Sequence, residues 1–183
     1  MRSRDEIKEF LRNMPQKAGL VDRAIIFARF AHDGQTDRGN RPYFEHPARV
    51  ASRTEDAYGD ELLTAAAYLH DTVEDGGLAI SDLKMFFPDV VWKTVAALTR
   101  AKTTPREEYI ENISRNYIAA KVKVCDLEDN IDLGHIPHPT AKDYERRDRY
   151  LAEYRKLKDA IADWERRLPP KELETAFYAE CYC

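Results

Sequence analysis

Hydrophobic side chains recur every three or four residues along most of this chain, and the alternation expected of β-strands is nearly absent. Only seven glycines interrupt the pattern in 183 residues. The pattern predicts an all-α fold, a helical bundle. The predicted helices cover residues 19–34, 47–59, 60–75, 81–87, 88–100, 105–116, 117–133 and 140–168.

A proline fixes one of these boundaries beside a histidine. A residue that precedes proline is disfavoured in the α conformation, whereas proline itself is tolerated in the first turn of a helix. We therefore expect His46 at the mouth of a helix that begins near Pro47, with its imidazole held at a fixed edge.

Composition limits the class of protein. With 43% hydrophobic residues the chain is long enough to bury a core, and no repeat or linker divides it, so we expect a single domain over residues 1–183 whose C-terminal helices span 140–183. The net charge of −4 and pI of about 5.8 provide no basic field, which argues against nucleic-acid binding. No stretch approaches the ~20 apolar residues of a membrane span, so we expect no membrane contact and a cytoplasmic location.

The three cysteines do not form the pattern of a disulfide framework. Cys125 falls in an apolar segment, where a small buried thiol is the ordinary interpretation. Cys181 and Cys183 lack both CxxC spacing and a nearby histidine, so they do not indicate a metal site.

The segment "YLHDTVEDG", residues 68–76, gathers one histidine and three carboxylates at the end of an apolar helix. On an α-helix His70 and Glu74 share one face, and Asp71 and Asp75 share the adjacent one. Burying one unpaired ionised carboxylate costs far more than the ~5–15 kcal/mol that keeps a typical domain folded. Positive charge must therefore lie among these side chains, supplied by basic residues or by a divalent metal.

A second group of acids favours the metal. In "KVKVCDLEDNIDL" an apolar run again ends in carboxylates, and Asp126 and Asn130 lie one helical turn apart. Two imidazoles and two carboxylates, from His46, His70, Asp71 and Asp126, make a mixed nitrogen and oxygen set suited to Mn²⁺, Fe²⁺ or Zn²⁺ with open water positions. Taken singly, each residue has an ordinary alternative, a capping histidine or a solvated aspartate.

The order and context of these residues resemble the metal-dependent HD phosphohydrolases. Within that family they are most similar to the alarmone hydrolase domains of Rel/SpoT proteins and their single-domain relatives. The resemblance spans about residues 24–130 and is looser beyond them. Its elements are His32, Gly34 and Gln35; Pro42, Tyr43, His46 and Pro47; His70, Asp71, Glu74 and Asp75; the segment "LTRAKTTPREEYIENI"; and Asp126 with Asn130.

The resemblance implies an HD-domain helical bundle and a role for each matching residue. The metal ligands would be His46, His70, Asp71 and Asp126, and Glu74 and Asp75 would position and activate the attacking water. The implied substrate contacts are Arg38, Arg41, Tyr43, Lys102, Asn130, Arg146 and Tyr150. For Arg146 the alternative is a solvated charge on a charged helix.

The chain departs from the family where alarmone hydrolases usually carry a basic pair. Here the run is "GQTDRGNRPY", with Asp37 at the first basic position and Arg38 at the second, and Arg41 is a nearby substitute. The resemblance implies Mn²⁺-dependent removal of the 3′-pyrophosphate from (p)ppGpp. Asp37 keeps open an alternative substrate: ppApp, the 2′-phosphate of NADPH or a nucleoside phosphate. A nonenzymatic helical module with a structural metal is a further alternative.

Overall fold

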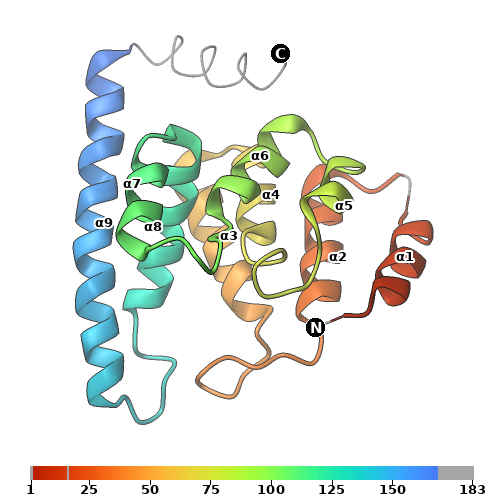
Figure 1. The fold of residues 1–183 in the computed structure, drawn as a ribbon, viewed down its shortest axis with the longest axis horizontal. Helices are drawn as coiled ribbons and strands as arrows, with labels where there is room; N and C mark the ends of the chain where they lie inside the picture. Colours follow the sequence, from red (N-terminus) through yellow and green to blue (C-terminus); the bar gives the residue numbers. More distant parts are fainter. Residues whose placement is uncertain (1, 16, 169–183) are drawn as a thin grey trace.

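The computed structural model describes residues 2–15 and 17–168, and that part of the chain is all-α with one isolated β-bridge, between Thr36 and Pro42 (Figure 1). The predicted fold class is confirmed. The helices are α1 (Arg4–Arg12), α2 (Leu20–His32), α3 (Glu45–Tyr58), α4 (Glu61–Leu69), α5 (Ile80–Lys84), α6 (Asp89–Leu98), α7 (Arg106–Ser114), α8 (Tyr117–Ile131) and α9 (Ala141–Arg167).

Helices α4 and α8 form the centre of the bundle. Helix α8 packs against α9, α3 and α7, and α4 packs against α3, α2 and α6. Small side chains at the contacts, such as Ala66 on α4 and Ala119 and Ala120 on α8, are fully buried and allow the helix axes to approach closely. In Figure 1 α9 lies along one side of the molecule, and α1 lies on the opposite side beside α2.

The long charged helix α9 packs through a narrow apolar stripe. Leu157 and Ile161 are its buried hydrophobic residues, and the rest of its surface is mostly charged. No helix among the described residues is both long and apolar enough to cross a membrane. The C-terminal part of the predicted domain, including Cys181 and Cys183, lies outside the described residues, whereas Cys125 is buried as expected.

Helix α1 is absent from the sequence-based prediction, although the sequence carries a signal for it. Ser3 Oγ accepts the backbone N–H of Glu6 at 3.3 Å, and the Glu6 carboxylate accepts the N–H of Ser3 at 2.7 Å. This reciprocal arrangement is the capping box expected from a Ser-x-x-Glu sequence. Phe10 then stacks on Phe30 at 3.9 Å between ring centroids and docks α1 on α2.

The prediction that α4 continues to residue 75 is wrong, because α4 ends at Leu69. Side chains satisfy the last carbonyl groups: His70 Nδ1 contacts Ala67 O at 2.7 Å, and Thr72 Oγ1 donates to Leu69 O at 2.7 Å. Residues 70–76 then form turns, and the chain leaves them at Gly77 with a φ of +82°. The histidine and acids therefore project from a turn, and the predicted helical faces do not apply.

The predicted start of α3 near Pro47 is late by one half turn, because the helix begins at Glu45. Backbone bonds from Glu45 N to Pro42 O and from His46 N to Tyr43 O, each 3.0 Å long, form a turn before the helix. Pro47 lies in the first helical turn, where its missing N–H would have had no partner. His46 is consequently the second residue of α3, with its backbone N–H bonded to Tyr43 O before it and Pro47 after it.

Candidate metal centre

Four side chains from three segments meet beside α8. His46 comes from α3, His70 and Asp71 come from the turn that follows α4, and Asp126 comes from α8. Asp126 Oδ1 lies 3.1 Å from His46 Nε2 and 3.6 Å from His70 Nε2. Asp71 Oδ2 lies 3.7 Å and 3.2 Å from the same two nitrogens. The structure thus brings together all four predicted ligands.

Both imidazoles are oriented through their other ring nitrogen. His46 Nδ1 lies 2.8 Å from Asp129 Oδ2, and His70 Nδ1 lies 2.7 Å from Ala67 O. These acceptors fix the proton on Nδ1 in a neutral ring and leave Nε2 facing the cluster. His70 Nε2 is buried and has no hydrogen-bond partner in the described part of the chain.

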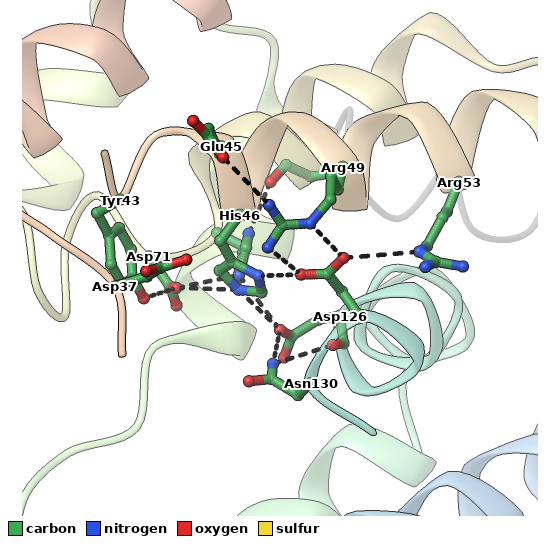
Figure 2. A network of polar contacts seen from close by, with 12 residues as sticks. Asp37, Tyr43, Glu45, His46, Arg49, Arg53, Asp71, Asp126 and Asn130 are labelled. Atoms are coloured by element: carbon green, nitrogen blue, oxygen red, sulfur yellow. Dashed lines mark hydrogen bonds and ion pairs between the residues drawn. The ribbon is translucent and has the colours of Figure 1, made fainter. Parts of the chain in front are cut away.

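The carboxylates are also held in place. Lys123 Nζ donates to Asp126 Oδ2 at 2.6 Å, and Asn130 Nδ2 donates to Asp126 Oδ1 at 2.6 Å. The Tyr43 hydroxyl donates to Asp71 Oδ2 at 2.7 Å. Figure 2 shows Tyr43 beside Asp71 and Asn130 beside Asp126, around His46. Each ligand atom therefore has a fixed direction before any ion binds.

Charge at the cluster favours a cation. Burial opposes ionisation of Asp126, but Lys123 and the two imidazoles outweigh it and hold its pKa well below the ordinary value. Burial likewise opposes protonation of His46, but Asp126 and Asp129 raise its pKa to about 9. Basic side chains, one of the two sources of positive charge that the sequence posed, therefore stabilise the buried carboxylate of Asp126.

The donor set fits a divalent transition metal. Ligand atoms of His46, His70 and Asp126 all lie within 4.8 Å of one another, and all three residues are buried. Mn²⁺, Fe²⁺ and Zn²⁺ all accept imidazole nitrogen and carboxylate oxygen as ligand atoms, and both kinds of atom are present in this cluster.

Glu74 and Asp75 lie at the same centre. Glu74 Oε2 accepts the backbone N–H of Arg100 at 2.9 Å, which fixes its carboxylate. Asp75 is held through its backbone, because its carbonyl oxygen accepts Gln35 Nε2 at 3.0 Å. Burial, together with the nearby charges of Asp71 and Glu74, raises the pKa of the Asp75 carboxyl. The two acids thus differ in their surroundings: the Glu74 carboxylate accepts a backbone hydrogen bond, and the Asp75 carboxyl has a raised pKa.

Two cavities flank the cluster and share Tyr43, His46, Asn130 and Tyr150 as a common wall. The larger has a volume of about 310 Å³, and its other lining residues are Thr36, Asp37, Arg38, Arg49, Asp129, Leu133, His135, Ile136, Asp143 and Arg146. The smaller has a volume of about 170 Å³, and its other lining residues are Asp71, Glu74, Asp75, Leu98, Arg100, Arg106, Tyr109, Lys123, Asp126 and Leu127.

The structure gives Asp37 a role inside its own loop. Asp37 Oδ1 accepts the backbone N–H groups of Gly39 and Arg41, at 2.8 and 2.9 Å. The Arg41 guanidinium lies 3.4 Å from Asp37 and 3.7 Å from Glu45, and Arg41 does not line either of the two cavities. Arg38 does line the larger cavity, where it pairs with the buried Asp143.

The remaining predicted contacts divide between cavity and surface. Arg146 and Tyr150 reach the larger cavity from α9, and Tyr150 reaches the smaller one as well. Lys102 is exposed on the loop between α6 and α7 and lines neither of these cavities. The sequence reasoning missed Arg49, Arg100, Lys123 and Asp129. Lys123 and Asp129 had a signal, since each lies three residues from Asp126 on one helix.

Comparison with known proteins agrees with this geometry. A family model described as an HD domain matches residues 24–165. This chain belongs to the HD domain family. Hydrolases of this HD domain family depend on a metal ion, and the grouping of His46, His70 and Asp126 meets that requirement.

Among HD domain relatives, guanosine-3′,5′-bis(diphosphate) 3′-pyrophosphohydrolases recur. MESH1 of Drosophila melanogaster, which has that name, is 34% identical over 147 residues, covering 75% of this chain and 82% of MESH1. The enzyme of Aquifex aeolicus is 30% identical over 133 residues, covering 70% of this chain and 19% of that protein. A probable enzyme of Synechocystis is 33% identical over 104 residues, covering 55% of this chain and 14% of the relative. The chain therefore spans less than a fifth of these two bacterial relatives.

A solved structure shares the fold. It is described as a metazoan ortholog of SpoT that hydrolyses ppGpp, and it superposes with a TM-score of 0.66 at 27% identity. The match covers 81% of this chain and 88% of the other.

Proposed function

We propose that this HD domain is a metal-dependent hydrolase that removes the 3′-pyrophosphate of (p)ppGpp, with Mn²⁺ as its metal. The observation that carries the proposal is the cluster of His46, His70, Asp71 and Asp126, in which His46 lines both cavities and Asp71 and Asp126 line the smaller one. MESH1, whose name states this activity, is matched over 82% of its length.

The reaction consumes one water and breaks one P–O bond. Water oxygen attacks the phosphorus that is bonded to the ribose 3′ oxygen, and the bond between those two atoms breaks. The 3′ oxygen gains a proton, so ppGpp yields GDP and pyrophosphate, and pppGpp yields GTP and pyrophosphate. A divalent metal held by the four ligands would supply charge stabilisation and lower the pKa of water.

Asp75 is the better placed of the two acids to accept the proton of the attacking water. Its carboxylate lines the smaller cavity, and its raised pKa brings it nearer to that of an effective general base at neutral pH. Glu74 is engaged by the N–H of Arg100, which suits a role in orienting the water. Tyr43 and Asn130 hold Asp71 and Asp126 in place.

The larger cavity is suited to the nucleoside. Leu133, Ile136 and Tyr150 offer apolar and aromatic surface for a base, and Arg146 offers a guanidinium group for phosphate. Arg38 lines the same cavity while it is paired with Asp143. Arg41 is occupied by Asp37 and Glu45, so Arg38 is the cation of this loop that faces the cavity.

A second candidate keeps the metal centre and changes the nucleotide. Asp37, a carboxylate in the loop that lines the larger cavity, is the observation in its favour. The substrate would then be ppApp, the 2′-phosphate of NADPH or a nucleoside phosphate.

A substrate panel separates these candidates. Purified protein with Mn²⁺ would be incubated with ppGpp, pppGpp, ppApp, NADPH and nucleoside triphosphates, and the products separated by anion exchange. We expect GDP and pyrophosphate from ppGpp, and no cleavage by the Asp71→Ala variant. Inertness toward ppGpp with cleavage of another compound would reassign the substrate, and inertness toward the whole panel would contradict the enzymatic proposal.

A further inference from the structure

The smaller cavity is lined by basic side chains as well as by acids of the metal centre. The three basic residues are Arg100 in the loop after α6, Arg106 at the start of α7 and Lys123 on α8. An anion bound in this cavity would lie beside these groups.

Two of the three cations are already neutralised within the protein. Lys123 Nζ lies 2.6 Å from Asp126 Oδ2. Arg106 donates Nε and Nη2 to the two carboxylate oxygens of Glu153, at 2.6 and 2.7 Å. Their positive charge is directed at these carboxylates.

Arg100 differs from both. Its Nη1 donates to Thr104 O at 3.0 Å, and its guanidinium has no carboxylate partner within the part of the chain that the structure describes. Its backbone N–H donates to Glu74, so the residue is fixed at both ends. A half-buried guanidinium held in this way presents its remaining N–H groups without a further ordering cost.

Lys102 lies two residues further along the same loop but is exposed and lines neither of the two cavities. The phosphate-facing role that the resemblance implies for Lys102 stays a prediction, and the experiment below compares it directly with Arg100.

We propose that Arg100 binds the diphosphate group of the substrate, and of the pyrophosphate product, in the smaller cavity. This rests on the proposed function, and it deepens that function by assigning the nucleoside and the leaving diphosphate to opposite sides of the metal cluster. In this position the remaining N–H groups of the Arg100 guanidinium donate to phosphate oxygens, an arrangement that recurs wherever arginine binds phosphate.

Binding of inorganic pyrophosphate tests the inference without requiring turnover. Equilibrium dialysis with ³²P-pyrophosphate at a fixed free Mn²⁺ concentration would compare the wild type with Arg100→Gln, Lys102→Gln and Arg115→Gln. Arg115 is the matched control, because it is the same residue type, is exposed at the C-cap of α7 and is paired only with Glu111 in the described structure. The Arg100→Gln variant keeps the backbone N–H that holds Glu74.

Arg100→Gln should weaken pyrophosphate binding by about tenfold or more, the loss expected for a charge-assisted hydrogen bond. Arg115→Gln should have no effect, and Lys102→Gln should have a smaller effect than Arg100→Gln. Arg100→Lys, which keeps the charge and loses the fork, should bind with intermediate affinity, and circular dichroism would verify folding of each variant.

Unchanged affinity in folded Arg100→Gln, or a larger loss in Lys102→Gln, would overturn the inference. The experiment distinguishes failure of this inference from failure of the proposed function. Arg100-dependent pyrophosphate binding without ppGpp cleavage would refute the proposed reaction alone. Cleavage of ppGpp with kcat/KM unchanged in Arg100→Gln would refute the inference alone.

Discussion

Asp129 connects His46 of the metal centre to the guanidinium of Arg49. The side chain is buried, and its oxygens contact His46 Nδ1 at 2.8 Å and Arg49 Nε and Nη2 at 2.7 and 2.9 Å. A carboxylate behind a metal-binding imidazole fixes the ring orientation and strengthens the donor nitrogen. Asp129 is therefore a positioning residue for His46.

Removing the charge of Asp129 should weaken metal binding. We expect Asp129→Asn to lower Mn²⁺ affinity by about 10- to 100-fold, measured as free Mn²⁺ by electron paramagnetic resonance. Glu128→Gln is the control, because Glu128 precedes Asp129 on α8 and contacts Tyr154 at 3.0 Å, away from the cluster. Equal affinities in the two variants would show that Asp129 only supports the fold.

The sequence predicted which side chains meet better than it predicted their surroundings. Histidine and aspartate at family spacing indicated His46, His70, Asp71 and Asp126, and the structure brings these four together. Their role as metal ligands stays a prediction. Arg100 and Arg49 carry no such signal, since an arginine on a charged chain is usually solvated and only the fold shows which cavity it lines. Arg41 illustrates the opposite case, a cation near the motif that contacts the loop's own acids.

Helix α1 shows how one ion pair docks an element. Arg4 donates to both carboxylate oxygens of Asp82 on α5, at 2.7 and 2.9 Å, and Asp82 also accepts the N–H of Ala79. Burial opposes ionisation of Asp82, but these hydrogen bonds outweigh it and hold its pKa below the ordinary value. A lowered native pKa means that the stabilisation is complete above the unfolded pKa of about 3.9 and is lost as pH falls through the native value.

The Asp82→Asn variant should therefore be less stable than the wild type at neutral pH, by about 2–4 °C in Tm. The difference should shrink as pH falls below about 4, because the carboxyl of the unfolded chain takes up a proton first and the native carboxylate follows at its lower pKa. Thermal unfolding followed by circular dichroism across this range measures it. Asp5→Asn, which alters an exposed carboxylate on α1, should show no comparable difference, and a pH-independent Asp82→Asn deficit would contradict the assignment.

Apolar periodicity and the positions of prolines were enough to predict five of the helices. Helices α2, α6, α7, α8 and α9 lie within their predicted ranges. Periodicity failed at α4, where the hydrogen bonds of His70 and Thr72 to helix carbonyls end the helix inside an otherwise helical sequence. It also failed at α1, because the short amphipathic segment becomes a helix through its cap and its docking on α2.

The larger cavity is lined by segments that lie far apart in the sequence. The loop before α3 meets the loop after α8 at Gly39, where an added Cβ would lie 2.3 Å from the His135 carbonyl oxygen. Arg38 extends the contact to Asp143 on α9. Sequence spacing does not reveal such a meeting, because it depends on how α3, α8 and α9 pack.

Gly39→Ala should force these two loops apart, since a backbone carbonyl blocks the new methyl group. We expect kcat/KM toward the nucleotide substrate to fall by about 10- to 100-fold, with Mn²⁺ affinity unchanged because the cluster lies on other segments. Steady-state kinetics and metal titration measure the two effects. Gly19→Ala is the control, because its nearest neighbour is a side-chain oxygen of Asp22 at 3.4 Å. Unaltered kinetics in Gly39→Ala would show that the closed loops are not needed.

Hydrolysis of ppGpp at its 3′-diphosphate by the metal centre can be followed by mass spectrometry. Purified protein, Mn²⁺ and ppGpp would be incubated in H₂¹⁸O, with a chelated sample in parallel, and the products analysed. We predict unlabelled GDP and pyrophosphate carrying one ¹⁸O atom, and no products after chelation. Release of orthophosphate, label in GDP, or no cleavage in the presence of Mn²⁺ would contradict the proposed hydrolysis.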